Sequence, residues 1–275
     1  MKKFAAMALA FTLALCLCAC EKKDAPPAAE DAWDYEVTTE ETAGEYKADD
    51  GMLLAFWSYE QPVLSLTEKD GAAATAPSEA MHAAVEAFNA EAFAQAQAAA
   101  ASFDGLKADA LARYNELTEE GNADFFAPYA QNEAVESVYR GGDLLSVTMS
   151  SYGYWGGAHG GAATRYMNFD LGAGRFFTLN DLTDDPAALR AAVAEEILAQ
   201  IGGQGVDEGY FPGYEETIRA KEDFNAGFDE TGVTVVFDEY EIAPYAAGIP
   251  AFTVSYDVLA PHLNDYGAAL LQRGE

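Results

Sequence analysis

The chain has 275 residues, half of them hydrophobic, and its 46 Asp and Glu outnumber 15 Lys and Arg to give a net charge of -31. A surface this acidic repels nucleic-acid phosphates and anionic lipid headgroups, and it attracts cations and basic proteins. Nucleic-acid binding is therefore excluded, and the simplest role of the acidity is solubility.

Residues 1–20 are typical of a bacterial lipoprotein signal peptide. Two lysines precede a short apolar run that ends in Leu17-Cys-Ala-Cys20, and the run is too short for a membrane span. We expect lipid on Cys20, which would hold the mature protein on the outer face of a cell membrane; secretion with cleavage elsewhere is the alternative. All three cysteines lie in this segment, so no disulfide is expected.

Residues 21–50 are predicted to form a disordered acidic tether. The segment holds Pro26-Pro27, scattered acids and almost no aliphatic residues. It cannot bury enough apolar area to offset the entropy of ordering. Trp33 and Tyr35 are its exceptions, and lone aromatics in tethers mostly stay free.

Residues 51–140 are predicted to be an N-terminal α+β half. Apolar runs at 53–59 and 63–66, split by Pro62, indicate two strands or one bent edge strand. Residues 125–139 are expected to be partly extended.

Two paired helices are expected inside this half. Ser78 is a good N-cap for a first helix, which is expected to end near Phe103. Asp104 is a good N-cap for a second helix, which is expected to end at Gly121. Apolar residues recur at helical spacing through both, which predicts core packing between them.

Residues 141–275 are predicted to be a second α+β half. Asp185 and Pro186 begin a helix that Gly202 ends, so its start and stop signals agree. Alternation and periodicity predict the following strands and further helices: strands 145–150, 166–171, 175–179, 233–237 and 251–256, and helices 215–224 and 258–271. The fold class is α+β, an antiparallel sheet packed against helices, with two sequential halves in one compact unit.

The segment between the first two of these strands is the candidate binding site. Aromatic side chains on a rigid loop are typical anchors of interfaces, although such rings also pack as a small core beneath a loop. We expect Trp155 to be the more exposed ring, and we expect Tyr240 and Tyr245 to be core. The candidate binding residues are Tyr152, Tyr154, Trp155, Gly156, Gly157 and His159.

His159 is the most plausible catalytic residue, because imidazole titrates near neutral pH. However, neither His82 nor His262 stands at metal-ligand spacing from it, and a histidine that stabilises the glycine loop by hydrogen bonds is favoured. We therefore predict no catalytic residue, no metal and no cofactor.

Three stretches together resemble a known family: Tyr152-x-Tyr-x-Gly-Gly-Ala-His-Gly160, Asn168–Leu182, and Asp238–Tyr245 with a closing strand. They are similar to the extracytoplasmic domain of the anti-sigma-V factor family. The same pair of halves resembles the non-catalytic part of some peptidoglycan deacetylases. The resemblance implies lysozyme binding outside the cell. No sigma-binding segment, transmembrane helix or deacetylase metal ligands are recognised, so we expect neither of those activities.

The sequence thus predicts a non-enzymatic, lipid-anchored extracytoplasmic binding protein. Its expected partner is a basic protein such as lysozyme, for which it would act as sensor or decoy. The alternatives are a peptidoglycan-binding accessory protein of the cell wall and an uncharacterised hydrolase that uses His159.

Overall fold

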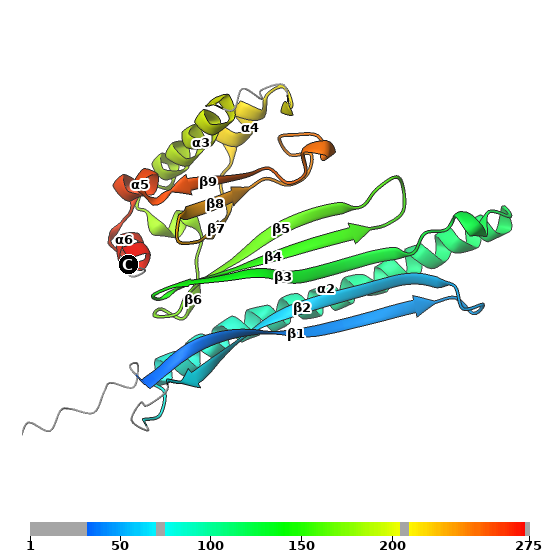
Figure 1. Ribbon diagram of the computed structural model, residues 1–275, viewed down its shortest axis with the longest axis horizontal. Helices are drawn as coiled ribbons and strands as arrows, with labels where there is room; N and C mark the ends of the chain where they lie inside the picture. The colour runs from blue at the N-terminus through cyan, green and yellow to red at the C-terminus, as the bar shows by residue number, and fades with distance from the viewer. Residues whose placement is uncertain (1–31, 70–74, 204–208, 273–275) are drawn as a thin grey trace, which may run out of the picture.

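The computed structural model describes residues 32–69, 75–203 and 209–272. The expected signal peptide, its Cys20 and the first part of the expected tether lie outside these residues. Within them, the chain forms a six-stranded and a three-stranded sheet with helices, which confirms the α+β class (Figure 1). No helix in the described part of the chain is both long and apolar enough to cross a membrane.

The six strands of the larger sheet lie side by side in chain order. Neighbouring strands are antiparallel except β2 and β3, which are parallel. A parallel pair needs a long crossover, and the helix α2 supplies it. The strands are β1 (Trp33–Lys47), β2 (Leu53–Glu68), β3 (Tyr129–Gly141), β4 (Leu144–Tyr154), β5 (Gly161–Asp170) and β6 (Arg175–Phe176).

The expectation of a tether as far as residue 50 is wrong, because Trp33–Lys47 is the edge strand β1. It pairs with β2 along its whole length. Tyr35 and Val37 pack against the core beneath, while most of the acids face solvent. An edge strand needs few apolar residues, since its ladder of backbone hydrogen bonds offsets much of the ordering entropy.

β2 is one continuous strand in the interior of the sheet rather than two strands or an edge. Pro62 pairs with Thr39 of β1, and β3 pairs only with residues 55–59 of β2. A proline lacks the N–H that a second neighbour would need. Pro62 is tolerated because it lies beyond the stretch that β3 covers.

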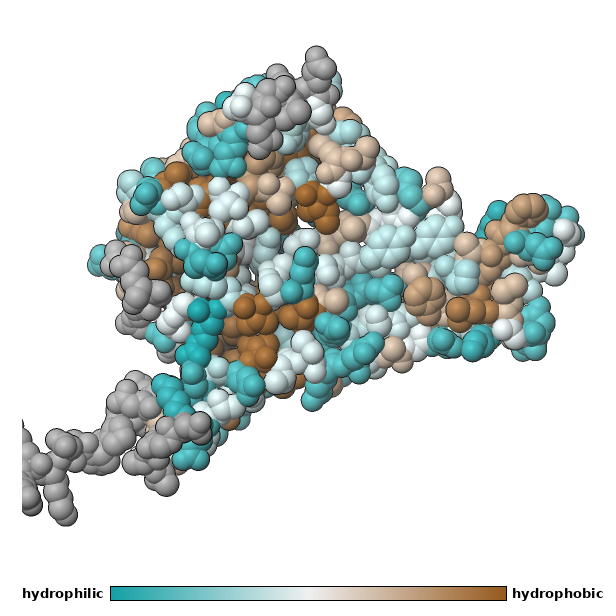
Figure 2. Space-filling model, in the orientation of Figure 1, coloured by the Kyte–Doolittle hydropathy of each residue, from teal (hydrophilic) through white to brown (hydrophobic). Residues whose placement is uncertain are grey.

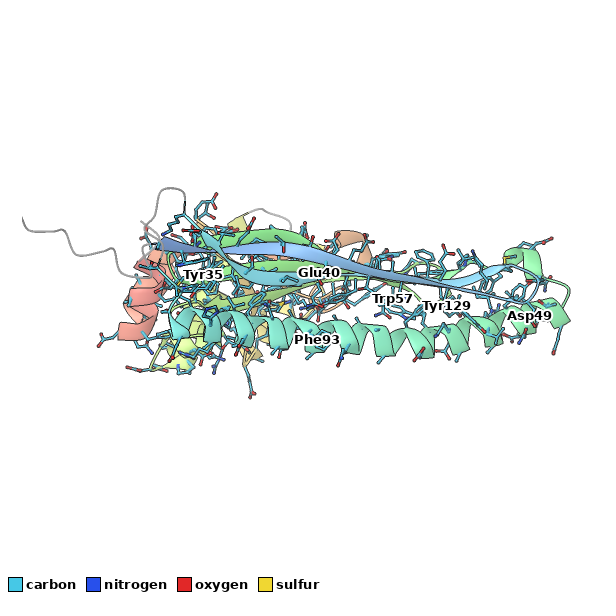
Figure 3. The ribbon with its side chains drawn as sticks, turned by 90° about the horizontal axis from the view of Figure 1, so that it is seen from below. Tyr35, Glu40, Asp49, Trp57, Phe93 and Tyr129 are labelled. Atoms are coloured by element: carbon cyan, nitrogen blue, oxygen red, sulfur yellow. The ribbon has the colours of Figure 1, made fainter. Side chains whose placement is uncertain are left out.

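A single helix, α2 (Glu79–Glu119), replaces the two that were expected. Ser78 caps it as predicted, accepting a hydrogen bond from the backbone N–H of Met81 at 3.2 Å. Asp104 forms an ion pair with Lys107 within the helix instead of capping a new one. Without a proline near this point the backbone continues, and α2 runs along one face of the sheet (Figure 3).

The smaller sheet and the remaining helices form a C-terminal unit beside β5 (Figure 1). Asp185 caps α3, since its Oδ1 accepts from the N–H of Ala188 at 3.1 Å. The last helix expected from 258 to 271 is instead divided, with a turn around Pro261. The elements are α3 (Pro186–Gly203), α4 (Tyr214–Ala220), β7 (Asn225–Phe228), β8 (Gly232–Val236), β9 (Ala251–Ser255), α5 (Tyr256–Leu259) and α6 (Asp265–Gln272).

The boundary between the halves does not lie between residues 140 and 141. That point falls at the turn from β3 to β4, inside the larger sheet. The change of unit comes after β6. A hairpin turn and a domain boundary both carry glycine and polar residues, so Gly141-Gly142-Asp143 gave no means to tell them apart.

Buried hydrogen bonds join the two units. Asn168 of β5 donates through Nδ2 to the carbonyl oxygen of Ala226 at 2.7 Å. The Ser146 hydroxyl donates to Asn168 Oδ1 at 2.7 Å and accepts from the Phe228 N–H at 3.0 Å. Asn168 and Ser146 thus fix β7 against the larger sheet, and this sets the position of the β8–β9 connection over β5.

Candidate binding site at the 155–160 loop

The loop from Trp155 to Gly160 connects β4 to β5, as the alternation on either side predicted. Gly156 and Gly157 have φ of 86° and 91°, a region that residues with a Cβ rarely adopt. These two glycines turn the chain sharply.

Trp155 lies across the end of β4. A Cβ on Gly153 would be 2.0 Å from Cη2 of Trp155, so the indole sits directly on this glycine. Despite this contact, Trp155 is still 56% exposed. One ring face is therefore supported by backbone while the residue remains accessible, as expected for a rigid anchor.

The other two aromatic candidates differ from each other. Tyr152 is 45% exposed. Tyr154 is half-buried: its ring packs edge-on against Tyr129 at 6.1 Å, and its hydroxyl donates to the carbonyl of Gly157 at 3.1 Å. Tyr152 and Trp155 are thus available to a partner, whereas Tyr154 supports the loop.

His159 joins the loop to the β8–β9 connection. Its ring stacks on Tyr245 with centroids 3.9 Å apart, and Nε2 lies 3.2 Å from the Tyr240 hydroxyl. Nδ1 is 2.7 Å from the Gly160 carbonyl, which only accepts, so Nδ1 carries a proton and donates. In the neutral ring, Nε2 then accepts from Tyr240.

Tyr240 and Tyr245 are not core residues, contrary to expectation. Tyr240 is 52% exposed and has a φ of 66°, the only positive φ of a non-glycine residue in the described chain. Such a conformation is costly for a bulky residue and is held by its surroundings. Here the contact with His159 and the turn from Asp238 to Glu241 hold it.

A cleft of about 680 Å³ lies between the loop and this connection. Ser102 of α2, the strands β3 to β5 and the segment from Asp238 to Tyr240 bound it. Its strand lining includes small residues such as Gly161 and Ala163, which leave room beside the rings of Trp155 and Tyr240. The volume is in the range of ligand-binding sites, roughly 300–1,000 Å³.

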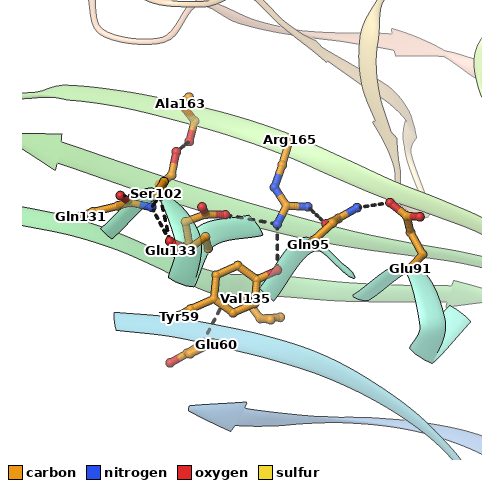
Figure 4. A network of polar contacts seen from close by, with 12 residues as sticks. Tyr59, Glu60, Glu91, Gln95, Ser102, Gln131, Glu133, Val135, Ala163 and Arg165 are labelled. Carbon is orange, nitrogen blue, oxygen red and sulfur yellow. Dashed lines mark hydrogen bonds and ion pairs between the residues drawn. The ribbon is translucent and has the colours of Figure 1, made fainter. Parts of the chain in front are cut away.

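A polar network supports the strand side of the cleft (Figure 4). Arg165 donates to the Tyr59 hydroxyl at 3.1 Å, to Glu133 at 3.2 Å and to Gln95. The amide of Gln131 exchanges hydrogen bonds with the Ser102 hydroxyl. The network fixes the strand surface relative to α2, so this side of the cleft is preorganised.

The carboxylates of the cleft fall into two classes. Glu133 is paired with Arg165. Asp238 and Glu239 have no cationic partner among the described residues, and Glu239 Oε2 lies 3.4 Å from the position of a Cβ on Gly161. Negative charge on one rim of the cleft is therefore not compensated by any cationic side chain of the described chain. The face seen in Figure 2 mixes hydrophilic, intermediate and hydrophobic residues.

Both ring nitrogens of His159 are engaged, by Gly160 and Tyr240, and no Ser, Thr or Cys side chain is bonded to it in the described chain. Those residues contain no group of three or more His, Cys, Asp or Glu that suits a metal ion. The contacts of His159 fix the loop.

Sequence reasoning missed the acidic rim and the strand side of the cleft. Asp238, Glu239 and Glu133 lie far from the loop in the chain, and in so acidic a sequence no single acid stands out. The one available signal was the density of tyrosines and acids between β8 and β9, which the resemblance also included.

The comparisons with known proteins concern both units. Residues 179–257 match the family model described as a protein of unknown function, DUF3298. Hence the match includes Asp238, Glu239, Tyr240 and Tyr245 but not the loop at 155–160. A search of the curated proteins found no match.

The solved structures similar to this chain include two from the DUF3298 family. The crystal structure of a DUF3298 family member from Bacteroides fragilis has a TM-score of 0.62 and 17% sequence identity, and the match covers 87% of this chain and 97% of that one. A DUF3298 family protein from Pseudomonas aeruginosa has a TM-score of 0.45 and 16% identity, over 86% and 97% of the two chains. The chain therefore shares the fold of the Bacteroides fragilis structure, and its residues 179–257 match the domain of unknown function that defines that family.

Proposed function

We propose that this protein is an extracytoplasmic binding protein, anchored by lipid on Cys20, that captures a basic protein at the cleft beside the 155–160 loop. One observation carries the proposal: two exposed, rigidly held aromatic residues, Trp155 and Tyr240, border a cleft whose rim carboxylates have no cationic partner in the part of the chain that the structure describes. Aromatic anchors with uncompensated charge are typical of protein-binding surfaces.

Charge supports the choice of partner. With a net charge of -31, the chain attracts cationic proteins over distances of the Debye length, about 8 Å at physiological salt. This attraction speeds encounter but gives little specificity by itself. Specific capture needs contacts that survive salt, and the rings and carboxylates of the cleft are suited to provide them.

Lysozyme is the first protein to test, because the resemblance to the anti-sigma-V family implies it. We would titrate lysozyme into the chain from residue 20 onward, carrying Cys20→Ser, by calorimetry at low and physiological salt. The proposal predicts saturable binding at both, with Trp155→Ala weakening it at least about tenfold, as for an interface hot spot.

The matched control is Phe125→Ala, which removes another exposed aromatic side chain outside the cleft. Binding that disappears at physiological salt, or that falls equally in Trp155→Ala and Phe125→Ala, would contradict capture at this cleft.

Peptidoglycan is a second candidate ligand, since the amides of Gln131 and Asn132 line the cleft beside Trp155. Amides and flat rings suit the hydroxyls and apolar faces of sugars. Sedimentation with insoluble cell wall, lost in Trp155→Ala but retained in Phe125→Ala, would favour this ligand over a basic protein.

The lipid anchor has its own test. In cells, the full chain is expected in the membrane fraction, and Cys20→Ser is expected to release it. Release from the membrane would leave binding at the cleft unchanged. Equal membrane association of both proteins would exclude anchoring through Cys20.

A further inference from the structure

We infer that the cleft is an arginine site, in which a guanidinium group of the partner lies between the rings of Trp155 and Tyr240 and the carboxylates of Asp238 and Glu239. The inference rests on the proposed function and specifies the chemistry by which the partner is recognised.

The first step is the position of the rim carboxylates. Asp238 and Glu239 both line the cleft, and Glu239 Oε2 lies over Gly161 at the start of β5. Gly161 has no side chain to occupy that space. A cation that enters beside Gly161 therefore reaches Glu239 directly, without displacing a side chain of this chain.

The second step is the aromatic wall. Trp155 rests on Gly153 and is 56% exposed, and Tyr240 is 52% exposed. A guanidinium group is planar, so it stacks on aromatic rings while its edge donates two hydrogen bonds to a carboxylate. An ammonium group does not combine these two contacts, and the site is therefore expected to prefer arginine to lysine.

The third step is rigidity. His159 bonds the Tyr240 hydroxyl and stacks on Tyr245, while the backbone of Tyr240 is held at a φ of 66°. Strained backbone persists where surrounding contacts over-determine it, and it often accompanies ligand sites. A ring that is already fixed loses little entropy on binding.

The fourth step is the contrast with Glu133. Its carboxylate is paired with Arg165, which also binds Tyr59 and Gln95. The chain thus compensates the acid on the strand side of the cleft and leaves those on the opposite rim without a cation among the described residues. The guanidinium is expected on the rim formed by Asp238 and Glu239.

The direct test uses small probes on the chain from residue 20 onward with Cys20→Ser. Acetylated, amidated Gly-Arg-Gly, Gly-Lys-Gly and Gly-citrulline-Gly would be titrated while the indole N–H signal of Trp155 is followed by NMR. Trp155→Phe assigns that signal. We expect saturable shifts with the arginine peptide, at least fivefold weaker binding of the lysine peptide, and none of the neutral citrulline peptide.

The matched variants separate the site from general charge. The double variant Asp238→Asn with Glu239→Gln is expected to bind the arginine peptide at least tenfold more weakly. Glu119→Gln combined with Glu120→Gln, at the end of α2, removes the same charge away from the cleft and is expected to leave binding within twofold. Equal losses in both double variants, or equal binding of arginine and lysine peptides, would overturn the inference.

The outcome for lysozyme is separate. Binding of lysozyme that is unchanged in the Asp238 and Glu239 double variant keeps the proposed function and overturns the arginine site. An arginine peptide that binds as expected, with no basic protein captured, supports the site and rejects the proposed function.

Discussion

Tyr240 combines a strained backbone with an exposed ring, which suggests that its conformation serves binding and not stability. Tyr240→Asn tests this, because asparagine tolerates positive φ but lacks the ring. We expect the free energy of unfolding to change by less than about 0.5 kcal/mol and the partner affinity to fall at least about tenfold. Urea unfolding and calorimetry measure the two quantities. A large loss of stability with full affinity would show that Tyr240 has a structural role instead.

Tyr166 is one of the half-buried tyrosines at which alkaline pH should act. Its ring packs on Gly227 of β7, and burial raises the pKa of its hydroxyl from about 10 to about 12. Since the folded state binds this proton more tightly, its contribution to stability is complete below about pH 10 and is lost as the pH rises toward 12. Tyr166→Phe should therefore lose less stability than the unsubstituted protein between pH 9 and pH 11.5 in urea unfolding. Phe125→Leu, a control at an exposed ring without a titrating hydroxyl, should follow the unsubstituted protein across this pH range.

At the scale of the single helix or strand, the sequence signals that gave correct predictions were local. The start and stop of α3 and the hairpin around the 155–160 loop follow from caps, glycines and alternation within one segment. β1 was missed because an edge strand with one solvated side carries little apolar periodicity. The sequence predicts two helices in place of α2 because Asp and Gly, here Asp104 and Gly105, are common at helix ends. Only the packing of α2 along the sheet shows that the helix continues through them.

The continuity of α2 predicts opposite effects of two glycine substitutions. Gly105 lies in the helix interior with nothing within 4 Å of an added Cβ, so Gly105→Ala should raise the free energy of unfolding by about 0.5–1 kcal/mol. Gly121 follows the helix with a φ of 75°, and Gly121→Ala should lower it by about 1 kcal/mol. Denaturant unfolding measures both. A loss of stability in Gly105→Ala would indicate that the helix is bent at this residue.

At the scale of the molecule, the cleft could not be predicted from the sequence. The loop residues were recognised, but Asp238 and Glu239 reach the cleft only because the C-terminal unit lies against β5. Glu133 reaches it from β3, which the sequence did not place beside the loop. The placement of the C-terminal unit depends on hydrogen bonds between polar residues of two strands, and Ser146 and Asn168 look like ordinary polar positions of alternating strands. The charge of the whole chain did predict the sign of the uncompensated groups at the rim.

The last prediction concerns the buried hydrogen bonds that join the two units. Asn168 is 8% exposed and bonds Ser146 and Ala226. Asn168→Ala leaves the buried Ser146 hydroxyl and the buried Ala226 carbonyl without the Asn168 amide as partner. This loss should lower the free energy of unfolding by about 2 kcal/mol.

The tryptophans allow the two units to be followed separately in that variant. All three, Trp33, Trp57 and Trp155, belong to the larger sheet or its loop, so fluorescence reports on that unit while circular dichroism reports on both. In the unsubstituted protein the two urea transitions should coincide, because the buried joint couples the units. In Asn168→Ala the circular dichroism transition should begin at lower urea than the fluorescence transition. The control Ser137→Ala removes an exposed hydrogen bond between β3 and β4, from the Ser137 hydroxyl to that of Thr148, and should leave both transitions in place. Coincident transitions at an unchanged midpoint in Asn168→Ala would mean that apolar packing alone joins the units, and that the cleft owes its geometry to that packing.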